Sequence, residues 1–227
     1  MNSKAFYRSG FFALMLGSGI ILLYPVLVFP KGELELMINQ HHFPVLDFWF
    51  KYITNIGDGV VMAVLLLVFL FYNYYLALLT LVSIVVQTIL VSIFKRWLFE
   101  GMERPLAFFG EDAVLNFVEG VAVHSTNTFP SGHTTTGFAV AALAFIAFNS
   151  RGHLASIFWF LIAMMVGFSR VYLLQHFVVD VYAGALFGLI SVISGLALLP
   201  LLFDENKLKR FKSHSLLTLM KKDQTQH

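Results

Sequence analysis

The longest stretch without a charged residue runs from Val60 to Phe94, and it limits the possible folds of this chain more than any other feature. A helix needs about 20 mostly apolar residues to cross a bilayer, where its backbone polar groups must pair within the protein. The stretch is too long for one crossing and fits two. We place the turn at Tyr72–Tyr75, because tyrosines favour the headgroup region. The sequence therefore predicts an all-α protein that spans a membrane several times.

The composition of the whole chain agrees with a membrane protein. Of its 227 residues, 58% are hydrophobic and only 12% are charged, whereas soluble domains carry about 25% charged residues. There is no cysteine, which excludes disulfides and Cys-ligated metal sites. The net charge of +2 is too small to indicate a nucleic-acid partner. We find no internal repeat and treat residues 1–227 as one domain, to which the sequence assigns no oligomeric state.

Further apolar runs bring the expected number of spans to six. They are Gly10–Phe29, Gly132–Asn149, Leu154–Ser169 and Val181–Phe203. The first run resembles a signal peptide, but it is longer than such a segment and lacks a small-residue cleavage site, so we interpret it as a retained span. We expect the last turn near Leu173–Phe177. Residues 31–58 are predicted to form an amphipathic helix at the membrane surface, with an irregular loop as the alternative.

The distribution of lysine and arginine predicts the orientation. Six spans put both termini on one side, with these basic residues: Lys4, Arg8, Arg151, Lys207, Lys209, Arg210, Lys212, Lys221 and Lys222. The other side holds Lys31, Lys51, Lys95, Arg96, Arg104 and Arg170 with most of the acidic residues. Because cytoplasmic loops carry the excess of positive charge, we expect cytoplasmic termini, including the basic tail 204–227. In a bacterium, this places the chain in the inner membrane.

Three polar clusters lie at span ends on the predicted outer side. They are "KRWLFEGMERP" with Lys95 and Arg104, "PSGH" at 130–133, and "SRVYLLQHFVVD" at 169–180. Ionisable groups next to the bilayer core are expensive and usually functional. Arginine presents a planar fork of donors that matches phosphate oxygens, and lysine adds a point charge. The clusters therefore indicate a site for an anion at the outer membrane–water interface.

The second cluster precedes an apolar run and adds backbone donors to this site. The N–H groups of Ser131 and Gly132 at a helix start would point at an anion, helped by the positive end of the helix. Gly132 would let a ligand approach the backbone closely. With Lys95, Arg104 and Arg170, these residues form a predicted phosphate-binding site.

Two histidines supply reactive groups. His176 and Asp180 are four residues apart, so on a helix they would share a face, and the carboxylate would hold one ring nitrogen and leave the other free. This makes His176 a candidate nucleophile and His133 a candidate general acid. Taken singly, each residue also has a structural explanation as a membrane anchor or a satisfied polar pair. Three clusters on one predicted face favour function.

A zinc site is the alternative for the same residues. His124, His133, His176 and Asp180 carry suitable ligand atoms. However, neighbouring arginines would repel a cation, and the sequence has no short ligand spacing such as H-E-x-x-H. We therefore predict a site that needs no metal and no other cofactor.

The three clusters together resemble the tripartite signature of the type 2 phosphatidic acid phosphatase superfamily, the lipid phosphate phosphatases. That pattern is Lys…Arg-Pro, then Pro-Ser-Gly-His, then Ser-Arg-x5-His-x3-Asp. The second and third parts match in full. The first departs, because eight residues separate Lys95 from Arg104 where the family commonly has six. The resemblance covers roughly residues 35–195.

The resemblance implies a metal-independent membrane phosphatase of bacterial type. In the family's mechanism, His176 would attack phosphorus to form a phosphohistidine, and Asp180 would orient it. His133 would protonate the leaving oxygen and later help to activate water. The phosphoryl oxygens would be bound by Lys95, Arg104, Ser131, Gly132 and Arg170.

The expected substrates are lipid phosphates or pyrophosphates. They include undecaprenyl pyrophosphate, phosphatidylglycerophosphate, phosphatidic acid and lipid A phosphates. An outward-facing site favours undecaprenyl pyrophosphate, and a broad lipid phosphatase is the close alternative. Two other functions stay open: a lipid-linked phosphotransferase that uses the same histidine, and a non-catalytic protein that binds lipid phosphates.

Overall fold

The computed structural model describes residues 3–110, 113–149 and 152–219, and this part of the chain contains helices and no strand. The predicted all-α fold is confirmed. Arg151, Lys221 and Lys222, which contribute to the predicted orientation, lie outside the described residues.

All six predicted spans contain a helix. They are α2 (Gly10–Val28), α5 (Gly59–Tyr72), α6 (Tyr74–Ile93), α8 (Gly132–Ala147), α9 (His153–Tyr172) and α10 (Val178–Leu202). Four helices are long and apolar enough to cross a membrane: α2, α9, α10, and α6 together with the π-helical turn η2 (Phe94–Leu98). A fifth span results if α5 is joined to Pro44–Gly57, from which it is bent by 55°. The predicted count of six is therefore approximate, because α8 is shorter.

The predicted turns occur where the sequence places them. Asn73 ends α5, and its side chain caps α6 by accepting the N–H of Leu76 at 3.1 Å. The turn at residues 173–177 joins α9 to α10. Helix α9 runs to Tyr172, beyond the predicted end at Ser169. The apolar pattern ended at Ser169 because the next residue, Arg170, is charged, but the helix continues through it.

One prediction was wrong, because residues 31–58 do not form a single interfacial helix. They form α3 (Glu33–Asn39), α4 (Pro44–Ile53) and the 3-10 turn η1 (Thr54–Gly57). Proline disfavours helix in the residue before it, so Pro44 begins a new helix and Phe43 stays extended. Helix α4 is amphipathic nevertheless, since Phe50 is buried while Trp49 and Tyr52 are exposed.

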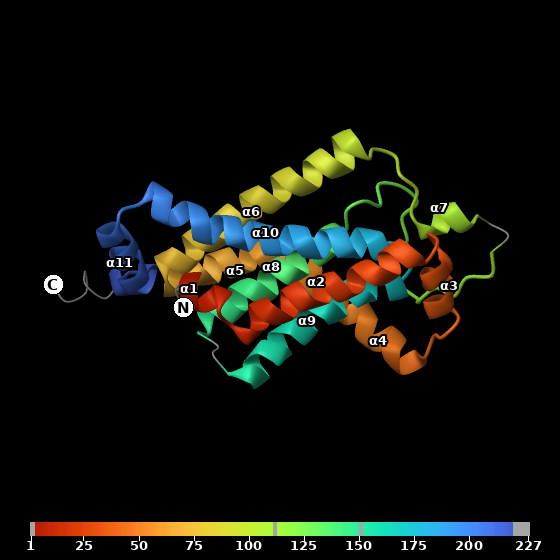
Figure 1. Cartoon of the computed structure of the whole chain (residues 1–227), viewed down its shortest axis with the longest axis horizontal. Coiled ribbons are helices and arrows are strands. Elements are labelled where there is room, and N and C mark those ends of the chain that lie inside the picture. The colour runs from red at the N-terminus through yellow and green to blue at the C-terminus, as the bar shows by residue number, and fades with distance from the viewer. Residues whose placement is uncertain (1–2, 111–112, 150–151, 220–227) are drawn as a thin grey trace.

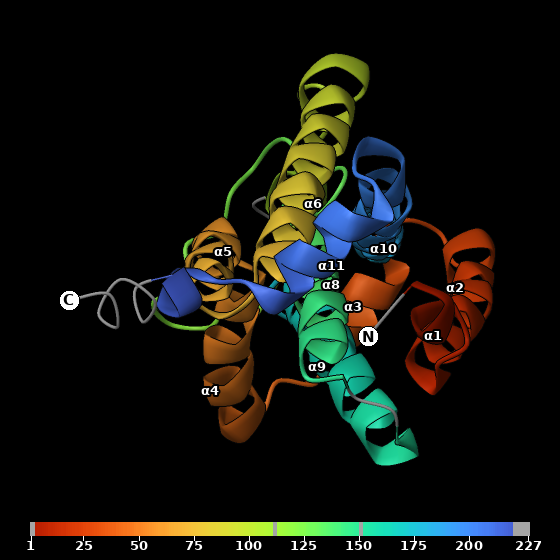
Figure 2. The same ribbon diagram turned by 90° about the vertical axis from the view of Figure 1, so that its left-hand side faces the viewer.

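Helix α8 lies at the centre of the bundle, surrounded by α5, α6, α9 and α10 (Figure 2). All of its residues from 134 to 146 are buried. Small residues permit this close packing: a Cβ atom added at Gly184 of α10 would lie 2.6 Å from the carbonyl oxygen of Ser131. A Cβ atom at Gly137 of α8 would meet the side chain of Val166 on α9 at 2.6 Å. The start of α8 is therefore pressed against α10.

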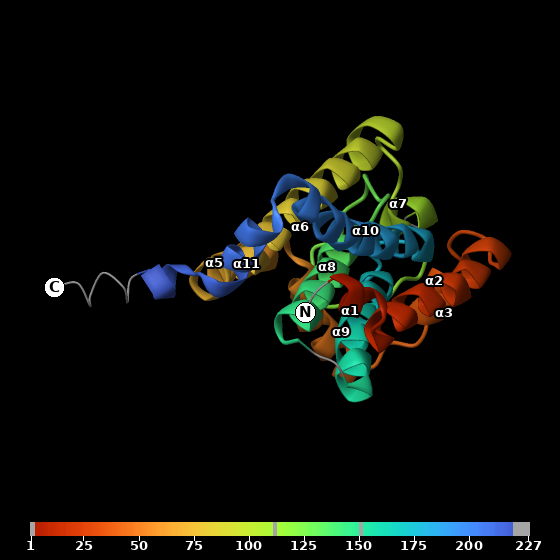
Figure 3. The same ribbon diagram turned by 60° about the vertical axis from the view of Figure 1, so that its left-hand side comes forward.

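The remaining short helices mark the two ends of the molecule. α1 (Ser3–Tyr7) and α11 (Glu205–Ser213) lie at one end, while α3, α4 and α7 (Pro105–Phe109) lie at the opposite end (Figure 1). The C-terminal end of α6 diverges from α10 toward the end that holds α7 (Figures 1 and 3). The shared position of α1 and α11 fits an even number of crossings.

Candidate active site

The residues of the three predicted clusters come from several segments at the end of the bundle that holds α3, α4 and α7. Lys95 lies in η2, and Arg104 precedes α7. Ser131 caps α8, whose first residues are Gly132 and His133. Arg170 lies in the last turn of α9, His176 lies in the turn before α10, and Asp180 lies in the first turn of α10. The helix starts and ends of three packed helices therefore meet at one place.

The start of α8 differs in one detail from the expected arrangement. Ser131 is the N-cap residue, and its hydroxyl oxygen accepts the N–H of Thr134 at 3.4 Å and the hydroxyl of Thr134 at 2.9 Å. The N–H of Ser131 donates to the carbonyl oxygen of Asp180 at 3.0 Å, so this donor is already paired, and a role of Ser131 in binding an anion stays a prediction. The N–H groups of Gly132 and His133, which follow in the first helical turn, have no intrahelical acceptor and point out of the helix start.

His176 and Asp180 are neighbours, but not because they share a helical face. α10 begins at Val178, so His176 precedes the helix. Asp180 lies in the first turn, where its Oδ2 accepts the N–H of Phe177 at 2.8 Å and lies 3.4 Å from Nδ1 of His176. Both side chains are at least 98% buried. With Nδ1 turned to the carboxylate, Nε2 is the nitrogen left free for chemistry.

Thr128 completes this pair, and sequence reasoning missed it. Its fully buried hydroxyl donates to Oδ2 of Asp180 and lies 3.4 Å from Nδ1 of His176. A single carboxylate oxygen thus meets a hydroxyl, a backbone N–H and an imidazole. The only sequence signal was the position of a hydroxyl residue two places before Pro130.

The two arginines are connected through Gln175, which the sequence analysis also missed. Arg104 donates from Nη1 to the backbone oxygen of Gln175 at 3.1 Å, and Arg170 donates from Nη2 to its Oε1 at 3.4 Å. Arg170 also donates to Oγ1 of Thr54 at 2.8 Å. Both arginine residues are more than 90% buried. Each carries five N–H donors, and Nε of Arg170 has no partner among the described residues, so donors are left for a ligand.

Glu35 fixes the turn that carries His176 from the other side. Its buried carboxylate accepts the N–H of Val178 at 2.6 Å and the N–H of Gly32 at 3.0 Å, which joins α3 to the start of α10. The ammonium group of Lys31 lies 4.2 Å from the centre of the Phe177 ring. A carboxylate is favourable at the N-terminus of a helix.

The electrostatics of the site favour a neutral His176. Burial lowers the pKa of His176 well below its usual value of 6.5, and the positive charges of Arg104, Arg170 and Lys95 lower it further. A neutral imidazole keeps a lone pair, which a nucleophile needs. Burial also lowers the pKa of Arg104, and the carboxylate of Asp180 opposes that shift. Lys95 is half-buried and its charge acts on His176, and its part in binding phosphate stays a prediction.

The expectation of a metal-free site stays a prediction. In the part of the chain that the structure describes, no three histidine or acidic side chains come together as a possible ligand set.

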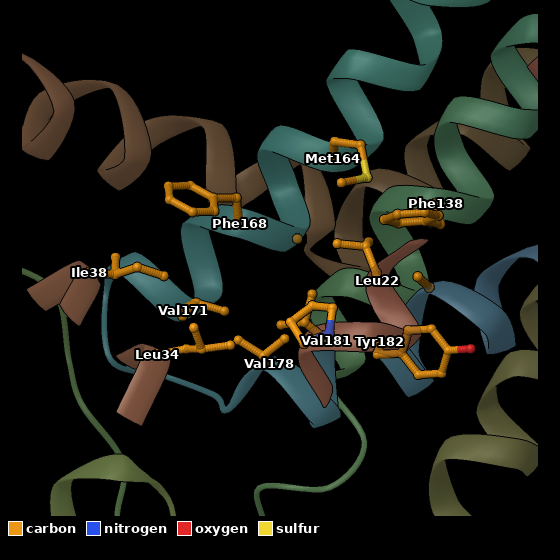
Figure 4. A pocket seen from close by; sticks show the side chains of 13 residues that line it. Leu22, Leu34, Ile38, Phe138, Met164, Phe168, Val171, Val178, Val181 and Tyr182 are labelled. Atoms are coloured by element: carbon orange, nitrogen blue, oxygen red, sulfur yellow. The ribbon is translucent and has the colours of Figure 1, made fainter. Parts of the chain in front are cut away.

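Two cavities of different character border this region. An apolar cavity of about 210 Å³ lies between α2, α3, α9 and α10, and its lining side chains, such as Leu34, Phe168 and Val181, are almost entirely hydrocarbon (Figure 4). A second cavity, of about 310 Å³, has a lining of mixed polar and apolar groups that includes Gly132 and His133. Only the second of these two cavities contains predicted site residues.

The order of these features along the chain matches a known family. A model of the PAP2 superfamily matches residues 76–203, which is more than half of the chain and includes all three clusters. The chain belongs to the PAP2 superfamily. The resemblance seen in the sequence is thereby confirmed.

Relatives of known name agree with this assignment. The chain is 35% identical to phosphatidylglycerophosphatase B of Bacillus subtilis over 140 residues, which cover 52% of this chain and 64% of the relative. It is 34% identical to probable lipid phosphate phosphatase 4 of Arabidopsis thaliana over 110 residues, which cover 42% of this chain and 35% of the relative. Each match spans less than two thirds of the relative's length.

A solved structure supports the fold. The crystal structure of Aquifex aeolicus LpxE superimposes with a TM-score of 0.63 at 29% identity, covering 75% of this chain and 97% of the other. With the apolar helices described above, the comparison identifies this chain as a multi-pass membrane protein.

Proposed function

We propose that this protein is a metal-independent phosphatase that removes phosphate from lipid phosphates or pyrophosphates through a phosphohistidine at His176. The observation that carries the proposal is the buried His176, which Asp180 holds at 3.4 Å and whose pKa is lowered by burial and by the positive charges of Arg104, Arg170 and Lys95. Positive groups placed before the reaction stabilise the charge of a transferring phosphoryl group.

The first half-reaction uses the two histidines on opposite sides of the phosphorus. Nε2 of His176 attacks phosphorus, and an N–P bond forms as the bond from phosphorus to the lipid oxygen breaks. His133 gives its proton to that leaving oxygen, and the lipid alcohol departs. Asp180 stabilises the positive charge on the His176 ring.

The second half-reaction restores the enzyme. His133, now without its proton, accepts a proton from water, whose oxygen attacks phosphorus. The N–P bond breaks, and inorganic phosphate leaves. Arg104, Arg170 and Lys95, with the free N–H groups of Gly132 and His133, bind the three phosphoryl oxygens in both steps.

The substrate is expected in the outer leaflet. The basic residues near α1 and α11 favour a cytoplasmic position for that end of the molecule, which turns the site toward the periplasm or the exterior. The names of the relatives, phosphatidylglycerophosphatase and lipid phosphate phosphatase, support a lipid that carries a terminal phosphate. Undecaprenyl pyrophosphate is added to these candidate substrates only because the site is predicted to face outward.

Phosphate release tests the proposal. The purified protein in detergent with EDTA is given a panel of lipid phosphates beside His176→Ala and His124→Ala. We expect release by the wild type and by His124→Ala, and none by His176→Ala. Loss of activity in EDTA or in His124→Ala would support the zinc alternative instead.

A second assay separates hydrolysis from transfer. When turnover of labelled substrate by the wild type is stopped by denaturation, an acid-labile label should remain on the protein, and His176→Ala should carry none, because it lacks the nucleophile. If the wild type releases phosphate only when a second lipid or alcohol is added, the protein is a phosphotransferase. Binding without any label or release would identify a non-catalytic protein.

A further inference from the structure

The cavity of mixed lining beside His133 has no part in the steps above. Its lining comes from the start of α5, from α6 and from the start of α8. The residues are Gly57, Gly59, Gln87, Thr88, Val91, Ser92, Gly132, His133, Thr135 and Thr136. Gly59 and Thr88 are exposed, so the cavity opens between α5 and α6, on the side of the bundle.

Gln87 is the unusual member of this lining. It is only 7% exposed, yet its Oε1 has no hydrogen-bond partner among the described residues. It lies in α6 between Val86 and Thr88, within the uncharged run that spans the membrane. A buried amide oxygen without a partner is costly in such a place and is normally satisfied by a donor. A group in the adjoining cavity is the partner that its position allows.

The position of the cavity indicates on which side of the phosphorus atom it lies. In phosphoryl transfer, the attacking and the leaving atoms lie roughly in line on opposite sides of phosphorus. His176 attacks and does not line the cavity, whereas His133, which protonates the leaving oxygen, does. The cavity therefore lies next to the first atoms of the leaving alcohol.

The chemistry of the lining indicates what those atoms are. Apart from His133, its polar side chains are one amide and the hydroxyls of four residues: Thr88, Ser92, Thr135 and Thr136. No carboxylate, lysine or arginine is among them, so a charged leaving group would find no counterion there. A hydroxyl both donates and accepts, and it pairs with either end of the Gln87 amide.

We propose that the Gln87 cavity is a leaving-group subsite, selective for lipids whose phosphate-bearing unit carries a free hydroxyl, as in a glycerol or a sugar. This inference rests on the proposed phosphatase activity and narrows its substrate class. Polyprenyl phosphates have no such hydroxyl, and the leaving group of a polyprenyl pyrophosphate is charged. The subsite therefore selects against undecaprenyl pyrophosphate, which orientation alone had favoured.

A matched pair of substrates and a matched pair of variants test this. The substrates are phosphatidylglycerophosphate and its analogue in which propanediol replaces the terminal glycerol, so that one hydroxyl is missing. The variants are Gln87→Met, which keeps the shape of the side chain, and Thr80→Val. Thr80 is the control because it lies on the same helix, is fully buried and has an unpaired hydroxyl, but does not line the cavity.

We expect the wild type and Thr80→Val to hydrolyse the hydroxyl-bearing lipid with a kcat/KM about 3- to 10-fold higher than the analogue, as one hydrogen bond allows. In Gln87→Met the ratio should fall to about 1, through loss on the hydroxyl-bearing lipid alone. A third substrate, a lipid-linked glucosamine 1-phosphate, distinguishes the two sources of the hydroxyl. The subsite takes a sugar if the selective loss falls on this lipid, and glycerol if it falls on phosphatidylglycerophosphate.

Two results would overturn the inference. One is a Gln87→Met variant that shows neither a lower ratio nor a selective loss on the lipid-linked glucosamine 1-phosphate, and the other is an equal loss on all substrates, which indicates a merely structural glutamine. In both cases phosphate is still released by the wild type, so the proposed function stands. If the wild type releases phosphate from none of the lipids, the proposed function itself fails, and the subsite fails with it.

Discussion

Two regions bring positive charge to the site in different ways. Where α8, α9 and α10 meet, glycines allow close packing, and Arg170 and the His176–Asp180 pair are almost completely buried and held by several partners. At the end of α6, which diverges from α10, Lys95 is only half-buried in a π-helical turn, and the neighbouring Trp97 is 84% exposed. The first region holds the buried side chains of the site in fixed positions, while the second contributes the positive charge of Lys95 from the edge of the site. Losses in activity should therefore decrease from the first region to the second.

The largest loss is expected at the buried pair. Asp180→Asn keeps the shape of the side chain but removes the charge that stabilises the His176 ring, so kcat should fall about 10³- to 10⁴-fold, as for other carboxylates that orient a catalytic histidine. Asp204→Asn is the control, since Asp204 caps α11 through Lys207 N–H and has no catalytic neighbour. A loss below about 10-fold in phosphate release would show that Thr128 holds the ring without the carboxylate.

Arg170→Lys tests geometry against charge in the same region. The variant keeps the positive charge but loses the planar fork that reaches Thr54 and Gln175, so kcat should fall about 10²- to 10³-fold, as when one transition-state donor is removed. Arg210→Lys, on the exposed helix α11, should change nothing measurable. Equal activity of Arg170→Lys and wild type would mean that this region supplies charge alone.

Lys95→Met tests the end of α6. Because Lys95 is half-buried at the edge of the site, its loss should reduce kcat/KM by only about 10-fold, within the range of a charge–charge contact in a partly polar setting. Arg96→Met changes the adjacent, exposed cation and should retain full activity. A loss as large as that of Arg170→Lys would show that the two regions bind the phosphate equally.

The buried histidine also predicts how stability depends on pH. The pKa of His176 is lowered in the folded protein, so between that pKa and the unfolded value of 6.5 the unfolded chain binds a proton that the folded chain does not. Stability should therefore fall as the pH drops below about 6.5, by at most about 1.4 kcal/mol per pH unit. Chemical unfolding of the wild type and His176→Gln between pH 7 and pH 5 measures this. Parallel curves for the two proteins would contradict the assigned shift.

The sequence predicted the location of the site better than its internal contacts. Helices of similar length return the chain to the same membrane face, so Arg104, His133 and Arg170 could be expected at one end. The contact between His176 and Asp180 was predicted from their spacing of four residues on one helix. The prediction was right about the contact but not about its cause, because α10 begins at Val178 and His176 precedes it. Thr128 and Gln175 were missed, since a buried hydroxyl or amide becomes meaningful only through partners from other segments.

The hydrogen bond from Ser131 N–H to the carbonyl oxygen of Asp180 has a consequence for a protein embedded in lipid. It joins the first turn of α10, which follows His176, to the start of α8, which carries His133, and the packing of Gly184 against Ser131 reinforces that joint. The two histidines therefore move as one unit when the outer helices tilt to match a thinner or thicker bilayer.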